Sequence, residues 1–173
     1  MFVFMNSKSS LALLKFLITN GGELHVREIS RQTGMSLGFV SRVLRQLHKD
    51  GLISAQRRGR MVLYRVDHAN VIVKQIKVLL TVTELYPLIK KFRTLTRRVI
   101  LFGSAARGEN MPDSDIDLFI MTNHPSEVRL FIRKHPRVVS IIMQSTEYAN
   151  LKKTDFALYD QINRGIALWE ESE

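Results

Sequence analysis

Residues 99–120 constrain the fold and the chemistry of this chain more than any other stretch. An apolar run predicts a buried strand that stops at the Gly103-Ser104 step, and a turn rich in Pro, Asn and Asp leads into a second apolar run. Two aspartates, Asp115 and Asp117, stand at the start of that second run. Because residues two apart in a strand point to the same face, we expect the two carboxylates to project together.

This arrangement of residue types predicts a site for a metal ion and a phosphate. Paired carboxylates at a strand end suit a hard divalent cation such as Mg²⁺, which prefers oxygen ligands. The Gly103-Ser104 turn offers backbone N–H groups to a phosphate, particularly if a helix begins there. The alternative is a loop whose aspartates cap a helix or face solvent. The position of both halves between two apolar strands favours the metal and phosphate site.

The Gly-Ser pair, ten further residues and Asp-x-Asp resemble the signature of polymerase-β-type nucleotidyltransferases, in particular the minimal forms. The resemblance implies a small α/β (α+β) domain over residues 98–173, with a mixed sheet flanked by helices. It implies transfer of NMP from Mg–NTP to a hydroxyl of a protein, RNA or small-molecule acceptor, with a HEPN-type toxin as one protein acceptor. The implied cofactors are Mg²⁺ (or Mn²⁺) and an NTP, ATP being the first choice. The implied metal and catalytic residues are Asp115 and Asp117, and the implied nucleotide and phosphate ligands are Gly103, Ser104 and Arg107.

The sequence lacks one feature of this family, and we expect weak activity because of its absence. Members of this family carry a third carboxylate on a later strand, but the only polar residue in the strand predicted at 138–143 is Ser140. A neutral hydroxyl cannot balance the charge of a second metal ion, so we expect slow transfer and attribute it to Ser140. The alternative function is a non-enzymatic transcriptional regulator whose nucleotidyltransferase-like domain senses nucleotide or dimerises.

The charge of the 173-residue chain is uneven, although its net value is +10. Residues 1–66 carry eleven Lys/Arg against three Asp/Glu, whereas residues 99–173 carry eight against eleven. A basic first half indicates a part that meets polyanions. Cysteine is absent, the apolar stretches are far shorter than the ~20 residues of a membrane span, and no signal peptide is evident, so we expect a cytoplasmic protein.

The basic half has the pattern of a helix-turn-helix followed by a hairpin. Helices are predicted at about 9–19, 27–33 and 37–49, with a tight turn at 34–36 in which Ser36 caps the third helix. Strands at 52–57 and 61–66 flank the hinge at Gly59. The segment resembles the winged helix-turn-helix domain of prokaryotic transcription regulators, and we assign it residues 1–68.

The resemblance implies binding of double-stranded DNA through the third helix and the wing. A recognition helix places its N-terminal residues on base edges while flanking cations bind phosphates. The base-proximal candidates are Ser36, Gly38, Ser41 and Arg42, and the phosphate-binding candidates are Arg45, Lys49, Arg57, Arg58 and Arg60. Protein-to-protein pairing is the alternative for this domain, and the arginine-rich wing favours DNA.

The rest of the chain is predicted to be mainly helical. Residues 69–97 form a helical linker of two helices, 71–80 and 83–95, which is also a candidate surface for a homodimer. A helix at 126–134 precedes the strand at 138–143, and a helix starting at 146 ends near Trp169. Its last part is expected to turn Ile162, Ile166 and Trp169 inward.

Overall fold

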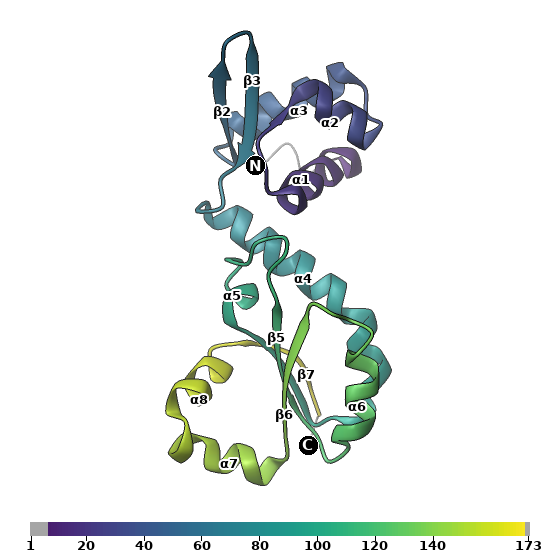
Figure 1. The fold of residues 1–173 in the computed structure, drawn as a ribbon, viewed down its shortest axis with the longest axis vertical. Helices are drawn as coiled ribbons and strands as arrows, with labels where there is room; N and C mark the ends of the chain where they lie inside the picture. Colours follow the sequence, from purple (N-terminus) through teal and green to yellow (C-terminus); the bar gives the residue numbers. More distant parts are fainter. Residues whose placement is uncertain (1–6, 172–173) are drawn as a thin grey trace. The chain divides into compact units, whose positions relative to one another are not determined.

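The computed structural model describes residues 7–171, and the chain divides into two compact units between Lys74 and Gln75 (Figure 1). The first unit, drawn in purple to blue, contains three helices and a small sheet. Its elements are α1 (Lys8–Asn20), β1 (Leu24–His25), α2 (Val26–Thr33), α3 (Leu37–Lys49), β2 (Ile53–Arg58) and β3 (Met61–Val66). The strands are antiparallel in the order β1-β3-β2, so β2 and β3 form the predicted wing.

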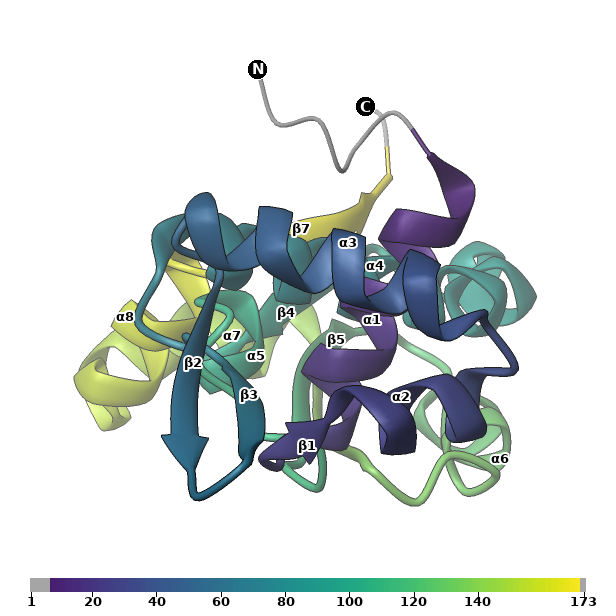
Figure 2. The same cartoon turned by 90° about the horizontal axis from the view of Figure 1, so that it is seen from above.

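The three helices of the first unit pack around a shared apolar core, beside which the β2–β3 hairpin extends (Figure 2). Leu14, Ile29 and Leu44, one from each helix, are fully buried. The predicted turn between α2 and α3 is confirmed. Gly34 adopts a left-handed conformation (φ 70°) after α2, and the Ser36 hydroxyl accepts a hydrogen bond from the Phe39 N–H at 3.4 Å. The winged helix-turn-helix fold expected from the sequence is therefore present.

The second unit is a four-stranded mixed sheet with helices on both faces. Its elements are most of α4 (Val71–Phe92), a 3-10 turn (Arg93–Leu95), β4 (Arg98–Phe102), α5 (Gly103–Ala106), β5 (Ile116–Met121), α6 (Pro125–Ile132), β6 (Val138–Met143), α7 (Ser145–Thr154), α8 (Phe156–Asn163) and β7 (Ile166–Glu170). The strand order is β6-β5-β4-β7. Only β5 and β6 are parallel, and β6 lies at an edge of the sheet.

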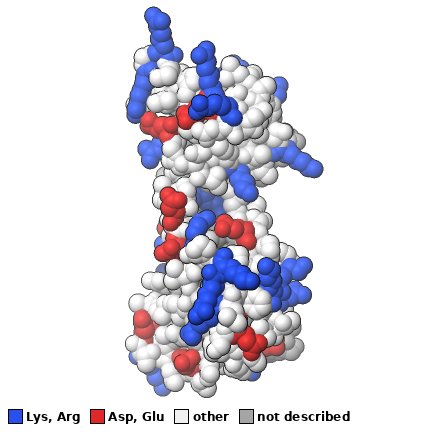
Figure 3. Space-filling view, turned by 45° about the vertical axis from the view of Figure 1, so that its right-hand side comes forward, with Lys and Arg blue, Asp and Glu red and all other residues white. Residues whose placement is uncertain are grey.

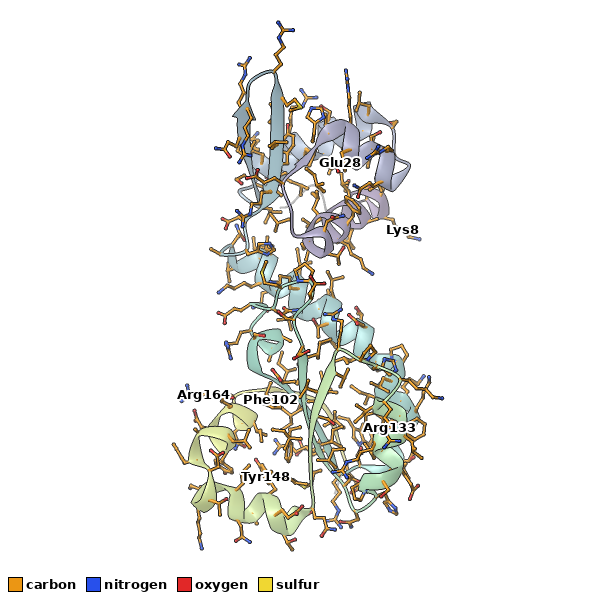
Figure 4. All side chains as sticks on the ribbon, in the orientation of Figure 1. Lys8, Glu28, Phe102, Arg133, Tyr148 and Arg164 are labelled. Carbon is orange, nitrogen blue, oxygen red and sulfur yellow. The ribbon has the colours of Figure 1, made fainter. Side chains whose placement is uncertain are left out.

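Successive side chains of β5 point to opposite faces of the sheet and pack in two separate cores. Leu118 and Ile120 pack with the second half of α4 and with α6, whereas Phe119 packs with residues of α7 and α8. Figure 4 shows Arg133 on the α6 side of the sheet, and Phe102 and Tyr148 on the side of α7 and α8. Asp117 shares the face of Phe119 because the two residues are two apart in β5.

The predicted linker differs from the structure. Residues 71–92 form one continuous helix with Pro87 inside it, rather than two helices. Leu85, Leu88 and Phe92 are buried in the core of the second unit. This packing offsets the hydrogen bond that proline removes, which is why the helix runs through a residue that usually breaks one.

The predicted C-terminal helix is interrupted at Asp155, and the prediction is wrong after residue 163. Asp155 leaves the helical conformation (φ −148°), and its carboxylate accepts from the Leu158 N–H at 2.9 Å to start α8. Ile162 is buried as expected, but Ile166 and Trp169 belong to β7, where they pair with β4. Gly165 makes this strand possible, because a Cβ there would meet the Leu101 carbonyl oxygen of β4.

Candidate functional site

The Gly-Ser step and the second aspartate of the motif meet at the end of two adjacent strands. Phe102 at the end of β4 is directly opposite Asp117 in β5. The chain then turns at Gly103 with φ 69°, a conformation that other residues rarely adopt. A Cβ on Gly103 would overlap Oδ2 of Asp117 and lie 3.1 Å from its Cγ. Any other residue here would displace the Asp117 carboxylate from its present position.

The two aspartates are close enough to influence each other. Asp115 is exposed immediately before β5, and Asp117 is half-buried within it. Burial raises the pKa of the Asp117 carboxyl above its usual value, and the Asp115 charge raises it further. A divalent cation would relieve both effects, so the two side chains fit a cation that binds through carboxylate oxygens. Among residues 7–171 no cluster of three His, Asp or Glu side chains suitable for a metal ion occurs.

The predicted phosphate residues lie around a short helix that follows β4. Ser104 is half-buried in α5, and its carbonyl accepts from the N–H groups of Arg107 at 3.2 Å and Glu109 at 2.9 Å, which closes the loop. The Arg107 guanidinium is exposed and pairs with the Glu109 carboxylate at 2.8 Å. Arg107 would therefore have to exchange this partner before it could bind a phosphate.

Two residues that the sequence did not single out lie in or against the loop before Asp115. Asn110 is buried within this loop, having 8% of its surface exposed. Arg137 donates from Nε to the Ser114 carbonyl (3.4 Å), and its own carbonyl accepts from the Ile116 N–H (2.8 Å). Arg137 thereby ties the start of β5 to the start of β6. No motif marks these positions, because their roles depend on the fold.

The expected role of Ser140 is wrong, because the register of β6 places it on the other face. In the parallel pair β5–β6, Val139 is opposite Asp117, and Ser140 is opposite Leu118. Ser140 therefore faces α6, whereas Val139 occupies the position beside Asp117 and is 47% exposed. A one-residue shift exchanges the faces of a strand, and the apolar run 138–143 did not fix that register. The residues present fit one cation and offer no third carboxylate from β6.

The candidate DNA-contact residues of α3 are mostly exposed on the helix surface away from its buried stripe. Ser36, Gly38, Arg42, Arg45 and Lys49 are exposed, and Ser41 is half-buried. The Arg42 guanidinium lies 5.6 Å from the centre of the Phe39 ring. The Arg45 Nε donates to the Ser41 carbonyl at 3.4 Å. These contacts are weak or local, so both arginines remain available to an anionic partner.

The three wing arginines differ in their surroundings. Arg58 forms an ion pair with Glu23 at 2.9 Å, and Arg57 donates from Nε to the Gly59 carbonyl at 3.2 Å. Arg60 is exposed and makes no ion pair within residues 7–171. Blue side chains project from the end of the hairpin in Figure 3. Of the three, Arg60 is the most readily available to a phosphate.

None of the helices in the described part of the chain is both long and apolar enough to cross a membrane.

Comparisons with known proteins match each unit separately. The family model for the MarR family matches residues 7–60, and the model for the nucleotidyltransferase domain matches residues 85–164. The chain is also 30% identical over 60 residues to an uncharacterized protein of Pyrococcus abyssi, and 29% identical over 72 residues to one of Pyrococcus horikoshii. These stretches cover 35% and 42% of this chain, but only 18% and 20% of those proteins.

Two solved structures resemble parts of the chain. One is a homodimeric winged helix-turn-helix DNA-binding domain from Mycobacterium bovis, with 31% identity and a TM-score of 0.38. The match covers 47% of this chain and 71% of that chain. The other is a protein of Sulfolobus solfataricus assigned provisionally as a nucleotidyltransferase, with 17% identity and a TM-score of 0.41. The match covers 57% of this chain and 88% of that chain. Both TM-scores are low, so the assignment depends on the two family models and on the motif geometry. The chain therefore joins a winged helix-turn-helix unit, which matches the MarR family model, to a unit that matches the nucleotidyltransferase domain model.

Proposed function

We propose that the second unit binds a Mg–NTP at Asp115 and Asp117 and transfers its NMP slowly to an acceptor hydroxyl. The acceptor oxygen would bond to the α-phosphorus as the bond to the leaving pyrophosphate breaks, and the hydroxyl proton would pass to solvent. The observation that carries this proposal is the approach of Gly103 to Asp117, where a Cβ would occupy the place of a carboxylate oxygen. Gly103 thus allows the half-buried Asp117 carboxylate to lie directly against the turn whose backbone N–H groups could bind a phosphate. The gathered negative charge indicates a cation.

The residues of the chain have separate roles in this proposal. Asp115 and Asp117 hold the cation, and the backbone around Gly103 and Ser104 binds the triphosphate. Arg107 would neutralise the outer phosphates after it leaves Glu109. When bound, the divalent cation supplies neutralisation of the charge that develops on the phosphate oxygens. ATP and Mg²⁺ are the first choices, and Mn²⁺ is the substitute with the same ligand preference.

The experiment that tests this proposal measures thermal stability of the full chain with and without Mg–ATP. A ligand that binds only the folded state raises the melting temperature by mass action. We expect a shift for the wild-type chain and none for Asp115→Asn/Asp117→Asn, whose size and shape are nearly unchanged. A shift of equal size in the double variant would show that the nucleotide binds elsewhere.

A second function is a transcriptional regulator that senses nucleotide without turning it over. The position of Val139 beside Asp117 favours it, because β6 then supplies no carboxylate to activate an attacking hydroxyl. Incubation of the chain with α-labelled ATP, Mg²⁺ and whole-cell extract separates the two. Label that becomes attached to an acceptor supports transfer, and a thermal shift without any transferred label supports sensing.

We also propose that the first unit binds double-stranded DNA through α3 and the wing. The base-contacting candidates are Ser36, Gly38, Ser41 and Arg42, and the phosphate-contacting candidates are Arg45, Lys49, Arg57, Arg58 and Arg60. The exposure of most α3 candidates and of all three wing arginines supports this arrangement.

A further inference from the structure

A hollow of about 350 Å³ lies at the free edge of β6, on the face of the sheet opposite Asp117. Arg129 and Arg133 from the α6 end line it together with His135. Val138 and Ser140 of β6 form its other side. A cavity of this size is within the range of small-ligand sites, at its lower end.

The charge of this region contrasts with the rest of its unit. Residues 125–137 carry four Lys/Arg and one Asp/Glu, whereas the remainder of 99–173 carries four Lys/Arg against ten Asp/Glu. Lys and Arg side chains gather over the face of the second unit on which α6 lies (Figure 3). A concentration of cations within an acidic unit indicates a specific anionic partner better than it indicates a general need for solubility.

The arginines of the hollow are available to bind a ligand. Arg129 and Arg133 are exposed, and neither forms an ion pair within the described part of the chain. Arg137, by contrast, pairs with Glu84 at 3.6 Å and also holds the Ser114 carbonyl. The three arginines of this region thus divide into one that holds the fold and two that line the hollow. Arginine is suited to phosphate because its planar guanidinium can donate two parallel hydrogen bonds.

The hollow lies across a single strand from the candidate metal site. Val138 and Ser140 face the hollow, while Val139 between them faces the side of Asp117. Neighbouring strands are only about 4.8 Å apart, and within residues 7–171 no further strand lies beyond β6. A flexible chain that passes round this edge can therefore place one group in the hollow and the next beside Asp117.

We propose that the hollow binds a backbone phosphate of single-stranded RNA, whose terminal hydroxyl is thereby directed toward Asp117. Single-stranded nucleic acid combines a flexible backbone with one phosphate per nucleotide, as the geometry requires. The Ser140 hydroxyl makes no hydrogen bond within residues 7–171 and can pair with a 2′-hydroxyl, which DNA lacks. The role of this RNA as acceptor rests on the nucleotidyl transfer proposed above, whereas its binding does not.

The test measures binding of a short fluorescent oligoribonucleotide to the full chain by anisotropy, without NTP or metal. All proteins carry Arg57→Ala/Arg58→Ala/Arg60→Ala, which removes the three wing arginines proposed to contact phosphate. Arg129→Ala/Arg133→Ala should weaken binding about tenfold and lower the slope of log affinity against log salt by about one, because each lost phosphate contact removes ~0.7. Lys152→Ala/Lys153→Ala removes the same charge from exposed positions on α7 and should leave the affinity nearly unchanged.

Two results would overturn the proposal. Equal loss in both double variants, or no loss in either, would show that the hollow is not the binding site. Equal binding of the matching oligodeoxyribonucleotide would overturn the choice of RNA. The Mg–ATP thermal shift, measured on the same proteins, separates this proposal from the previous one. If Mg–ATP shifts the melting temperature normally but RNA binding does not depend on Arg129 and Arg133, only the RNA site is contradicted. If RNA binding depends on these arginines but Mg–ATP gives no shift, only the nucleotide site is contradicted.

Discussion

Gly103 and Asp117 lie so close that a single methyl group on the glycine would take the place of one oxygen of the carboxylate. The two residues belong to different strands and are separated by a loop, yet the pairing of Phe102 with Asp117 brings them together. The spacing of the sequence motif therefore has a steric basis. The glycine turns the chain at the end of β4 and leaves open the volume that the aspartate of β5 enters.

Gly103→Ala should destabilise the second unit and abolish its Mg–ATP thermal shift. The left-handed backbone alone costs an alanine about 1–2 kcal/mol, and the overlap with Oδ2 of Asp117 adds to this cost. Denaturant unfolding and thermal shift measure the two effects. Gly34→Ala is the matched control, because its φ of 70° is the same but no atom lies within 4 Å of the added Cβ. This control should keep a normal Mg–ATP shift, and a normal shift in Gly103→Ala would contradict the assigned role.

The raised pKa of Asp117 predicts how the free energy of unfolding changes with pH. The carboxyl holds its proton more tightly in the folded state than in the unfolded state, so stability from this group is greatest below the unfolded pKa of about 3.8 and is lost as pH rises through the folded value. Asp117→Asn has no such proton and should show a flatter dependence of unfolding free energy on pH across that window. Metal affinity should change in the opposite direction and increase as the carboxyl ionises. A variant whose pH profile matches that of the wild-type chain would contradict the raised pKa of Asp117.

Sequence patterns predicted the elements whose signals are local. Ser36 caps α3 and Gly34 ends α2, as their residue types indicate. Asp115 and Asp117 were identified as neighbours from period-two alternation, and the raised Asp117 pKa agrees with their proximity. The elements that were predicted wrongly depend on contacts between residues distant in sequence. Residues 166–170 form a strand because Gly165 packs against β4, and no local pattern reports that packing.

The wing arginines should contribute unequally to DNA affinity. Arg60→Ala should weaken binding to all duplex sequences and lower the salt slope by about one, because it removes a phosphate contact. Arg58→Ala should have a smaller effect, since Arg58 already pairs with Glu23 at 2.9 Å and must give up that partner. Titrations at several salt concentrations measure both. Affinity that does not change between low and physiological salt would contradict DNA binding by this surface.

Arg42→Ala should act on sequence preference rather than on overall affinity. Arg42 is exposed near the start of α3, where a recognition helix reaches base edges. Loss of a base contact should cost about 1–3 kcal/mol at the preferred site and much less on random DNA. Competition between the two DNAs gives the ratio. Equal loss on both would place Arg42 among the phosphate contacts instead.

Val139→Asp should raise nucleotidyl transfer, and Ser140→Asp should not. Val139 is opposite Asp117 in the parallel register and is 47% exposed, so an aspartate there can stand beside the existing pair without entering the core. A third carboxylate would offset the charge of a further cation and help it activate the attacking hydroxyl. Ser140 faces α6, so its aspartate adds the same charge on the wrong side of the sheet. We expect transfer of α-labelled ATP to increase several-fold in the first variant only, with similar Mg–ATP shifts in both. An equal increase in the two variants would mean that net charge, rather than position beside Asp117, limits the reaction.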